Sequence, residues 1–564
     1  MTPTPPERST ATQHDPARAA KELADIAGQS QRAIQAFWSR QLEEHSGRSF
    51  SLIDSQSVGN AFLEWSGALM SDPAKLAGLQ MRFWQEQMNV FQRAVQRAGG
   101  AQVEPIAEPE RGDRRFKDPT WNEEVLYDYL KQSYLVSAKW LRGVTREAGS
   151  VSPETQEKVD FYTRQFVSAM SPSNFAATNP AVLKRAQESG GQNLVEGLKR
   201  LLGDLEKGGG RLKISMTDEA AFEVGRNVAT TAGKVVYQNE LMQLIQYAPT
   251  TDKVHRRPLL IVPPWINKYY ILDLQPKNSF VKHAVDQGHT VFVVSWVDPD
   301  RELASKTFED YMSLGPLAAI DAIERAVDEK EVTILGFCIG GILVSATLSY
   351  LATTGKASRV KAATFLTSLF DFEDVGEVSV FIDESQIAQI EKHVTEKGYL
   401  EGRHMADMFS MMRENDLIWS FVVNNYLLGR EPMAFDLLYW NSDSTRLPAA
   451  MLVFYLKEIY QRNKLKEPGG IRLMGEPIDL SAVETPTYFM AAKEDHIAPW
   501  QSCYPGTQLF SGQRRFVLAA SGHIAGVVNP PAAKKYGHWT GSTLPPDPSD
   551  WFEGAEWQEG SWWP

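Results

Sequence analysis

Short apolar runs alternate with helical spacers through the second part of the chain. The runs are rich in β-branched residues and mostly lack polar alternation, which is typical of parallel strands buried on both faces. They occupy residues 258–262, 289–296, 332–337, 363–370, 487–492 and 515–519, after an extended hairpin at 234–247. Apolar spacing typical of helices occurs between them, at 272–287, 308–328 and 342–353. Strand alternating with helix over this length predicts an α/β sheet.

The first part of the chain has a helical pattern instead. Apolar and aromatic residues recur at helical spacing in 20–38, 73–96 and 121–141. We expect residues 1–20, which are rich in Pro and Thr, to be disordered, and residues 21–215 to form a mainly helical domain. Packing between helices is the simplest reason for such stripes, and contact with a partner surface or an apolar polymer is the alternative.

One interval interrupts the strand and helix alternation of the second part. Between the strand that ends near Phe370 and the strand that begins at Thr487, the pattern is mainly helical. The clearest helical segments lie at 385–395, 405–413 and 449–465. We therefore predict a single α/β domain over residues 216–564 that carries a helical cap insertion at about 372–480. The aromatic and Met residues of this interval suit an apolar lid, and packing within the cap explains most of them equally well.

Composition narrows the class of protein. A net charge of −12 argues against a nucleic-acid binder, which would have a basic face. The chain has two cysteines, Cys338 and Cys503, so we expect no disulfide framework and a reducing compartment. The first residues lack the layout of a signal peptide, and no apolar run reaches the ~18–20 residues of a membrane span. We expect a cytosolic protein without a transmembrane segment, and the histidines lack a spacing typical of metal ligands.

The segment 332–348 contains the strongest candidate for chemistry. A predicted strand runs into Gly336-Phe337-Cys338-Ile339-Gly340, and a predicted helix follows directly. Strand, tight turn and helix with this spacing describe a nucleophile elbow of the α/β-hydrolase fold, with cysteine in place of serine. Small residues flank the nucleophile because the turn is strained and side chains there would meet neighbouring backbone. The alternative is an unreactive buried cysteine beside a glycine-rich turn.

A nucleophilic cysteine needs a base and an acid that orients the base. In α/β-hydrolases these follow the nucleophile in the order acid, then histidine, each after a late strand. Asp495 follows the predicted strand 487–492, and His523 follows the strand 515–519. Asp371, after an earlier strand, is the rival for the acid, and His496 is a weaker candidate for the base. We predict the triad Cys338, Asp495 and His523.

The reaction class follows from the thiol. A neighbouring histidine and a helix N-terminus both lower the pKa of a cysteine, and both are predicted beside Cys338. We expect the backbone N–H of Ile339 to form half of an oxyanion hole and that of Ile266, in the loop 263–267, to form the other half. Exchange between a cysteine and a thioester substrate changes the free energy little. The residues therefore predict a cysteine acyltransferase or thioesterase that acts on acyl thioesters.

The sequence around these residues resembles the polyhydroxyalkanoate synthases. Gly336-Phe-Cys-Ile-Gly-Gly341 is similar to the modified lipase box of that family. The resemblance covers essentially residues 110–564. Its further motifs are the segments 263–276, 438–445, 494–500 and 521–531. Ala525 and the single long chain resemble class I of the family, whose substrates have short acyl chains. Trp265 departs from the family pattern, in which many class I relatives have a smaller residue.

The resemblance implies an activity and a setting. Enzymes of this family polymerise (R)-3-hydroxyacyl-CoA, chiefly 3-hydroxybutyryl-CoA, into polyester and release CoA. By resemblance Cys338 is acylated, His523 is the base and Asp495 is the third member, with no metal or redox cofactor. It also implies a homodimer at the surface of cytoplasmic polymer granules, where granule-associated proteins are further partners. An acyl-CoA thioesterase or polyester depolymerase, and a non-enzymatic granule-coating protein, are the competing functions.

Overall fold

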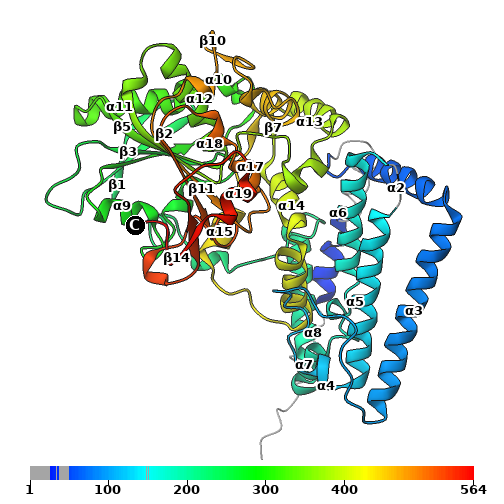
Figure 1. The fold of residues 1–564 in the computed structure, drawn as a ribbon. Helices are drawn as coiled ribbons and strands as arrows, with labels where there is room; N and C mark the ends of the chain where they lie inside the picture. Colours follow the sequence, from blue (N-terminus) through cyan, green and yellow to red (C-terminus); the bar gives the residue numbers. More distant parts are fainter. Residues whose placement is uncertain (1–25, 34, 37–49, 148, 150) are drawn as a thin grey trace, which may run out of the picture.

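The computed structural model describes residues 26–33, 35–36, 50–147, 149 and 151–564. The predicted disorder at 1–20 and both ends of the predicted helix at 20–38 lie outside the described residues, while residues 26–33 and 35–36 are helical as predicted. Figure 1 shows two parts of the chain: long helices from the first part stand to one side, and the sheet with its covering helices forms the rest. The limits that we predict for the domains stay predictions.

The N-terminal part is helical, as the apolar spacing predicts. Its longer helices are α2 (Ser55–Met70), α3 (Pro73–Ala98), α5 (Val125–Arg146), α6 (Pro153–Ala169), α7 (Pro180–Ser189) and α8 (Gln192–Lys207). The side chain of Asp72 caps α3 by accepting from the N–H of Lys75 at 3.0 Å, and Pro73 occupies the first turn, where no N–H is required. Between α5 and α3, Trp140 donates its indole N–H to the carbonyl of Leu79 at 2.9 Å. Capping and packing thus define these helices.

The rest of the chain forms one ten-stranded sheet in the order β1-β2-β4-β3-β5-β6-β11-β12-β13-β14. Its central strands β3, β5, β6, β11 and β12 run parallel, as expected for an α/β fold. The strands are β1 (Gly233–Gln238), β2 (Met242–Tyr247), β3 (Leu259–Val262), β4 (Val291–Trp296), β5 (Val332–Phe337), β6 (Val360–Leu366), β11 (Thr487–Ala492), β12 (Arg514–Ala519), β13 (Gly537–Thr540) and β14 (Glu556–Glu559). The antiparallel strands β13 and β14 extend the sheet beyond the last predicted strand.

Two predicted helices differ from those observed. The predicted helix 272–287 is only a short turn at Tyr269–Leu272 and the helix α9 (Phe280–Asp286), because Pro276 interrupts the segment. The predicted helix 308–328 is divided into α10 (Phe308–Met312) and α11 (Ala318–Val327) by a π-helical turn at Ser313–Leu317. In both segments a proline removes the backbone donor on which a continuous helix depends.

A helical insertion between β6 and β11 is confirmed. It contains α13 (Glu384–Lys397), α14 (Gly402–Met412), α15 (Asp436–Ser442) and α16 (Ala449–Phe454). The predicted helix 449–465 leaves α-helical geometry at Tyr455 and continues as a π-helical turn to Gln461. The cap also contacts the N-terminal helices, since Gln165 of α6 donates to the carbonyl of Met411 at 2.9 Å. No helix within the described part of the chain combines the length and the apolar character needed to cross a membrane.

Candidate active site

The turn between β5 and α12 (Ile339–Thr353) has the geometry of a nucleophile elbow. Cys338 has φ 53° and ψ −125°, a backbone conformation that residues other than glycine rarely adopt. A Cβ on Gly336 would lie 2.4 Å from the Cα of Gly341, and one on Gly340 would lie 2.3 Å from the carbonyl oxygen of Val262. The sequence places glycine at these positions because strand, turn and helix touch through their backbones there.

Hydrogen bonds hold this strained turn in place. The N–H of Cys338 donates to the carbonyl of Leu366 on the neighbouring strand β6 at 2.8 Å. The hydroxyl of Ser368 donates to the carbonyl of Cys338 at 2.9 Å. Strain at a functional residue persists only where the surroundings determine the conformation, and here β6 does so.

His523 and Asp495 come together in the order that the sequence predicts. Nδ1 of His523 lies 2.6 Å from Oδ2 of Asp495. The other carboxylate oxygen, Oδ1, accepts from the N–H groups of Ile497 and Ala498, both at 2.9 Å. The side chain of Asp495 has no exposed surface and that of His523 is 5% exposed. The carboxylate is therefore fixed in position, and it in turn orients the imidazole ring.

The electrostatics of His523 follow from this arrangement. Burial favours the neutral ring, but the carboxylate of Asp495 and the sulfur of Cys338 outweigh it and raise the pKa of His523 to about 10. Cys338 acts on the ring both as a charge and as a hydrogen-bond partner. The phenyl ring of Phe337 stacks on the imidazole with a centroid separation of 5.7 Å. His523 is thus paired with Asp495, and it lines the same cavity as Cys338.

Asp371 and His496, the alternative candidates for the acid and the base, make other contacts. Asp371 accepts from Nδ2 of Asn463 at 2.6 Å and from Nζ of Lys466 at 2.9 and 3.0 Å, and it orients no imidazole. His496 lies beside the pair, but burial lowers its pKa to about 4, and its Nδ1 has no partner among the described residues. Neither residue has the contacts that a member of the triad requires.

The loop after β3 lies opposite the first turn of α12. Ile339 begins this helix, so its N–H has no acceptor within the helix. Thr445 anchors the loop, because its N–H donates to the carbonyl of Ile266 at 2.8 Å and its hydroxyl donates to that of Trp265. Ile266 lines both cavities at Cys338 and Ile339 lines the smaller one, so the two residues meet beside the thiol. Their roles there stay predictions.

Trp265 fills space beneath this loop. It is 1% exposed and its ring lies 4.9 Å from that of Tyr311 and 5.6 Å from that of Trp296. The side chain by which this sequence departs from the family pattern is therefore part of the core as well as of the cavity wall. Its size limits the width of the cavity at the elbow.

Two cavities of different character meet at Cys338. One, of about 80 Å³, is lined almost entirely by apolar side chains from the cap, among them Met405, Met408 and Leu456, with Leu52 from the N-terminal part. The other, of about 300 Å³, also reaches His523 and has charged groups in its wall, including Arg413 and Glu494. The nucleophile therefore stands between an apolar compartment and a partly polar one.

The last tryptophans of the chain support the loop that carries the base. The indole N–H of Trp562 donates to the carbonyl of Gly526 at 2.8 Å, and that of Trp563 donates to the carbonyl of Val527 at 2.9 Å. Both acceptors follow His523 within the same loop. Nothing in the spacing of these tryptophans along the sequence indicates that they hold this loop.

Comparison with known proteins agrees with the fold and then identifies the family within the class. A family model of the α/β-hydrolase fold matches residues 257–530. A crystal structure of a hydrolase from Pseudomonas aeruginosa PA01 is 13% identical, covering 53% of this chain and 95% of that chain, with a TM-score of 0.32. So low a score supports no comparison of the two sites. The class that fold and site define is that of the α/β hydrolases.

Closer relatives define the family. The model of the poly-beta-hydroxybutyrate polymerase N-terminus matches residues 112–284. A poly(3-hydroxyalkanoate) polymerase from Methylorubrum extorquens is 48% identical over 88% of this chain and 82% of its own length. The polymerase subunit from Cupriavidus necator is 43% identical over 93% of this chain and 88% of its own. The chain belongs to the poly(3-hydroxyalkanoate) polymerase family, and it is an acyl-transferring enzyme.

Proposed function

We propose that this polymerase acts on short-chain (R)-3-hydroxyacyl-CoA, chiefly 3-hydroxybutyryl-CoA, through a covalent acyl thioester on Cys338. The observation that supports the proposal is the pairing of His523 with Asp495 in the cavity that Cys338 also lines, at the end of the parallel strands. A thiol at this elbow accepts an acyl group from one thioester and holds it as another. The exchange suits transfer of the acyl group better than its loss to water.

Loading of the enzyme uses the triad once. His523 takes the thiol proton, and the thiolate of Cys338 attacks the carbonyl carbon of the substrate thioester. The N–H groups of Ile339 and Ile266 hold the negative oxygen of the tetrahedral intermediate. The bond between the carbonyl carbon and the CoA sulfur then breaks, and CoA leaves with the proton from the imidazolium. The product is acyl-Cys338 and free CoA.

Elongation uses the same residues again. The hydroxyl of one acyl unit loses its proton to His523, with Asp495 stabilising the imidazolium that forms. The oxygen attacks the carbonyl of a second acyl thioester, an ester bond forms, and the thiol that leaves recovers the proton. The apolar cavity suits the acyl units, and the partly polar cavity suits the side from which CoA arrives.

One face of α3 supports a second part of the proposal, contact with the polymer. Its residues are apolar, exposed and spaced at helical intervals: Met81, Trp84, Met88, Phe91 and Val95. Apolar side chains that stay exposed on one helix face indicate a surface that meets another apolar surface. We propose that this α3 face touches the polyester granule in the cytoplasm. Homodimerisation and contact with granule-associated proteins stay proposals that rest on the family alone.

A single assay separates the proposed function from its competitors. The protein is incubated with 3-hydroxyacyl-CoA substrates of increasing length, CoA release is followed, and the product is sized. We expect fastest release with 3-hydroxybutyryl-CoA and a high-molecular-mass polyester as product. Release of CoA with free hydroxyacid as the only product would indicate a thioesterase instead. Faster release with medium-chain substrates would contradict the proposed chain length while leaving the polymerase assignment intact.

A further inference from the structure

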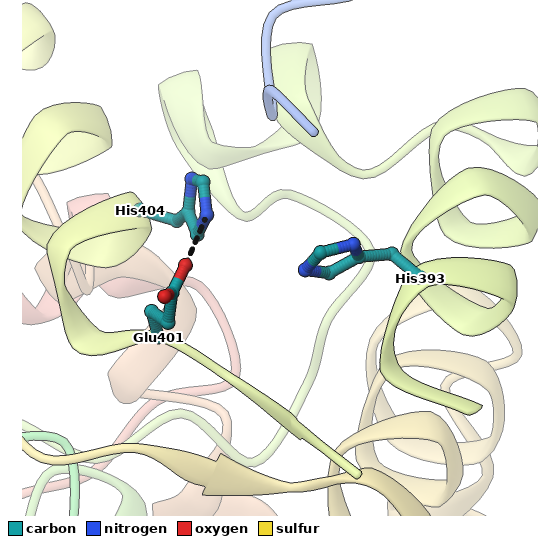
Figure 2. A group of neighbouring side chains, drawn as sticks. All are labelled: His393, Glu401 and His404. Carbon is teal, nitrogen blue, oxygen red and sulfur yellow. Dashed lines mark ion pairs between the residues drawn. The ribbon is translucent and has the colours of Figure 1, made fainter. Parts of the chain in front are cut away.

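Two histidines and a glutamate form a cluster in the cap, away from the triad. His393 comes from α13, and Glu401 and His404 lie at the start of α14. Figure 2 shows the ring of His393 facing the pair formed by Glu401 and His404 across a small gap. In the sequence Glu401 and His404 have a Glu-x-x-His spacing, and His393 lies eight residues before Glu401.

The distances in this cluster are close to those around a metal ion. Nε2 of His404 lies 3.3 Å from Oε2 of Glu401. Tetrahedral Zn²⁺ with ligands at about 2.0–2.1 Å keeps its ligand atoms roughly 3.3 Å apart. The ligand atoms of all three residues lie within 4.8 Å of one another, which is close enough for one ion to draw them together.

One ring nitrogen of each histidine in the cluster lacks a hydrogen-bond partner among the described residues. Nε2 of His393 and Nε2 of His404 are buried and accept or donate no hydrogen bond among the described residues. His404 is 3% exposed. The ring of Phe50 stacks on His393 at 4.1 Å and lies 5.2 Å from His404, so water has little access from that side. A buried polar atom without a partner is unfavourable, and a bound ion would supply the missing partner.

The charges around the cluster allow a cation. Glu401 is ionised, with Lys397 at 2.6 Å from Oε1 and Arg403 against Oε2. These two cations weaken the attraction for a metal ion, and an ion on the side of His404 would share Oε2 with Arg403.

We propose that His393, Glu401 and His404 form a binding site for Zn²⁺ that ties α13 to α14. Two imidazoles and one carboxylate are ligands that Zn²⁺ prefers over harder ions such as Mg²⁺ or Ca²⁺. Ile390 of α13 and Met405 and Met408 of α14 line the apolar cavity beside Cys338. The ion would therefore stiffen one wall of that cavity. It would take no part in the chemistry at the thiol.

The test uses the full-length protein without an affinity tag, stripped with a chelator and then dialysed against Zn²⁺ or Co²⁺. We expect one ion per chain by elemental analysis, a tetrahedral absorption spectrum with Co²⁺, and a rise in melting temperature with Zn²⁺. In His393→Gln and in Glu401→Gln the affinity should fall by at least about tenfold and the rise in melting temperature should disappear. Circular dichroism checks that each variant is folded.

A matched control uses the other neighbouring histidines. The rings of His255 and His289 lie 4.7 Å apart on another part of the surface. His255→Gln should leave the stoichiometry, the Co²⁺ spectrum and the thermal shift unchanged. The proposal is overturned if the wild-type protein retains no ion at micromolar concentration. It is equally overturned if His255→Gln abolishes binding while His393→Gln and Glu401→Gln do not.

Discussion

The elbow region and helix α3 use apolar residues in opposite ways. Around Cys338 the strands and α12 bury nearly every apolar side chain, and the strained turn depends on that packing. Along α3, Trp84 and Phe91 are 69% and 54% exposed although the helix is well capped and packed on its other side. Apolar residues thus stabilise the fold in one region and are available for contact in the other. Changes in the two regions should therefore affect different properties of the enzyme.

Removing the thiol should give the largest effect. Cys338→Ala should lower CoA release from 3-hydroxybutyryl-CoA by at least about 10⁴-fold, because no covalent intermediate can form. The measurement is CoA release, with mass spectrometry of the acylated protein. The variant should still bind polyester granules through α3. Retained activity would contradict the assignment of Cys338.

Changing the acid should have the next largest effect on the same region. Asp495→Asn keeps an oxygen that can accept from Ile497 and Ala498, but it removes the charge beside His523. We expect a loss of about 10³–10⁴-fold in turnover, and a greater loss in elongation than in acylation. Single-turnover acylation and steady-state polymerisation measure the two steps. Equal losses in both would show that Asp495 only orients His523.

Two glycines compare the stability of the elbow with that of α5, the helix on which α3 packs. Gly340→Ala would bring a Cβ to 2.3 Å from the carbonyl oxygen of Val262, so we expect the free energy of unfolding to fall by about 1–3 kcal/mol, together with lower activity. Gly143→Ala in α5 meets nothing within 4 Å and should stabilise the protein by about 0.5–1 kcal/mol. Denaturant unfolding measures both. A neutral Gly340→Ala would show that the elbow has more room than its contacts indicate.

The dependence of stability on pH should show the pairing of His523 with Asp495. Because folding raises the pKa of His523 to about 10, its stabilising contribution is fully present below about pH 6.5 and is lost as the pH rises toward 10. The free energy of unfolding of the wild type should therefore exceed that of Asp495→Asn by the largest amount at pH 6 and by the smallest amount near pH 10. Urea unfolding at several pH values measures this difference. A constant difference would show that the pairing does not raise the pKa.

The smallest effect on catalysis should come from the α3 face. Trp84→Glu with Phe91→Glu places charge on the exposed apolar residues and should weaken granule association by roughly tenfold or more. CoA release from dissolved substrate should change less than about twofold. Gln85→Glu with Gln92→Glu, on exposed positions of the same helix, is the charge-matched control. Equal loss in both pairs would show that charge alone, and not the apolar face, decides the association.

The sequence predicted where the candidate site residues lie because each of them follows a strand at a recognisable turn. Cys338, Asp495 and His523 all lie where chain order and strand ends place them, and the contact of the rival Asp371 with Lys466 could not be read from the sequence. The support that Trp562 and Trp563 give to the base could not be predicted, since it depends on the strands β13 and β14 that return the chain to the sheet. The cluster of His393, Glu401 and His404 depends likewise on how two helices meet.

The second cysteine makes the protein convenient for chemical labelling. Cys503 is 3% exposed, and burial raises the pKa of its thiol well above the usual range. Its thiol donates to the carbonyl of Ala498 at 3.5 Å and borders neither cavity at the nucleophile. Alkylating reagents should therefore modify Cys338 alone in the folded protein. The amount of label bound per chain would then measure the fraction of active enzyme in a preparation, independently of its turnover rate.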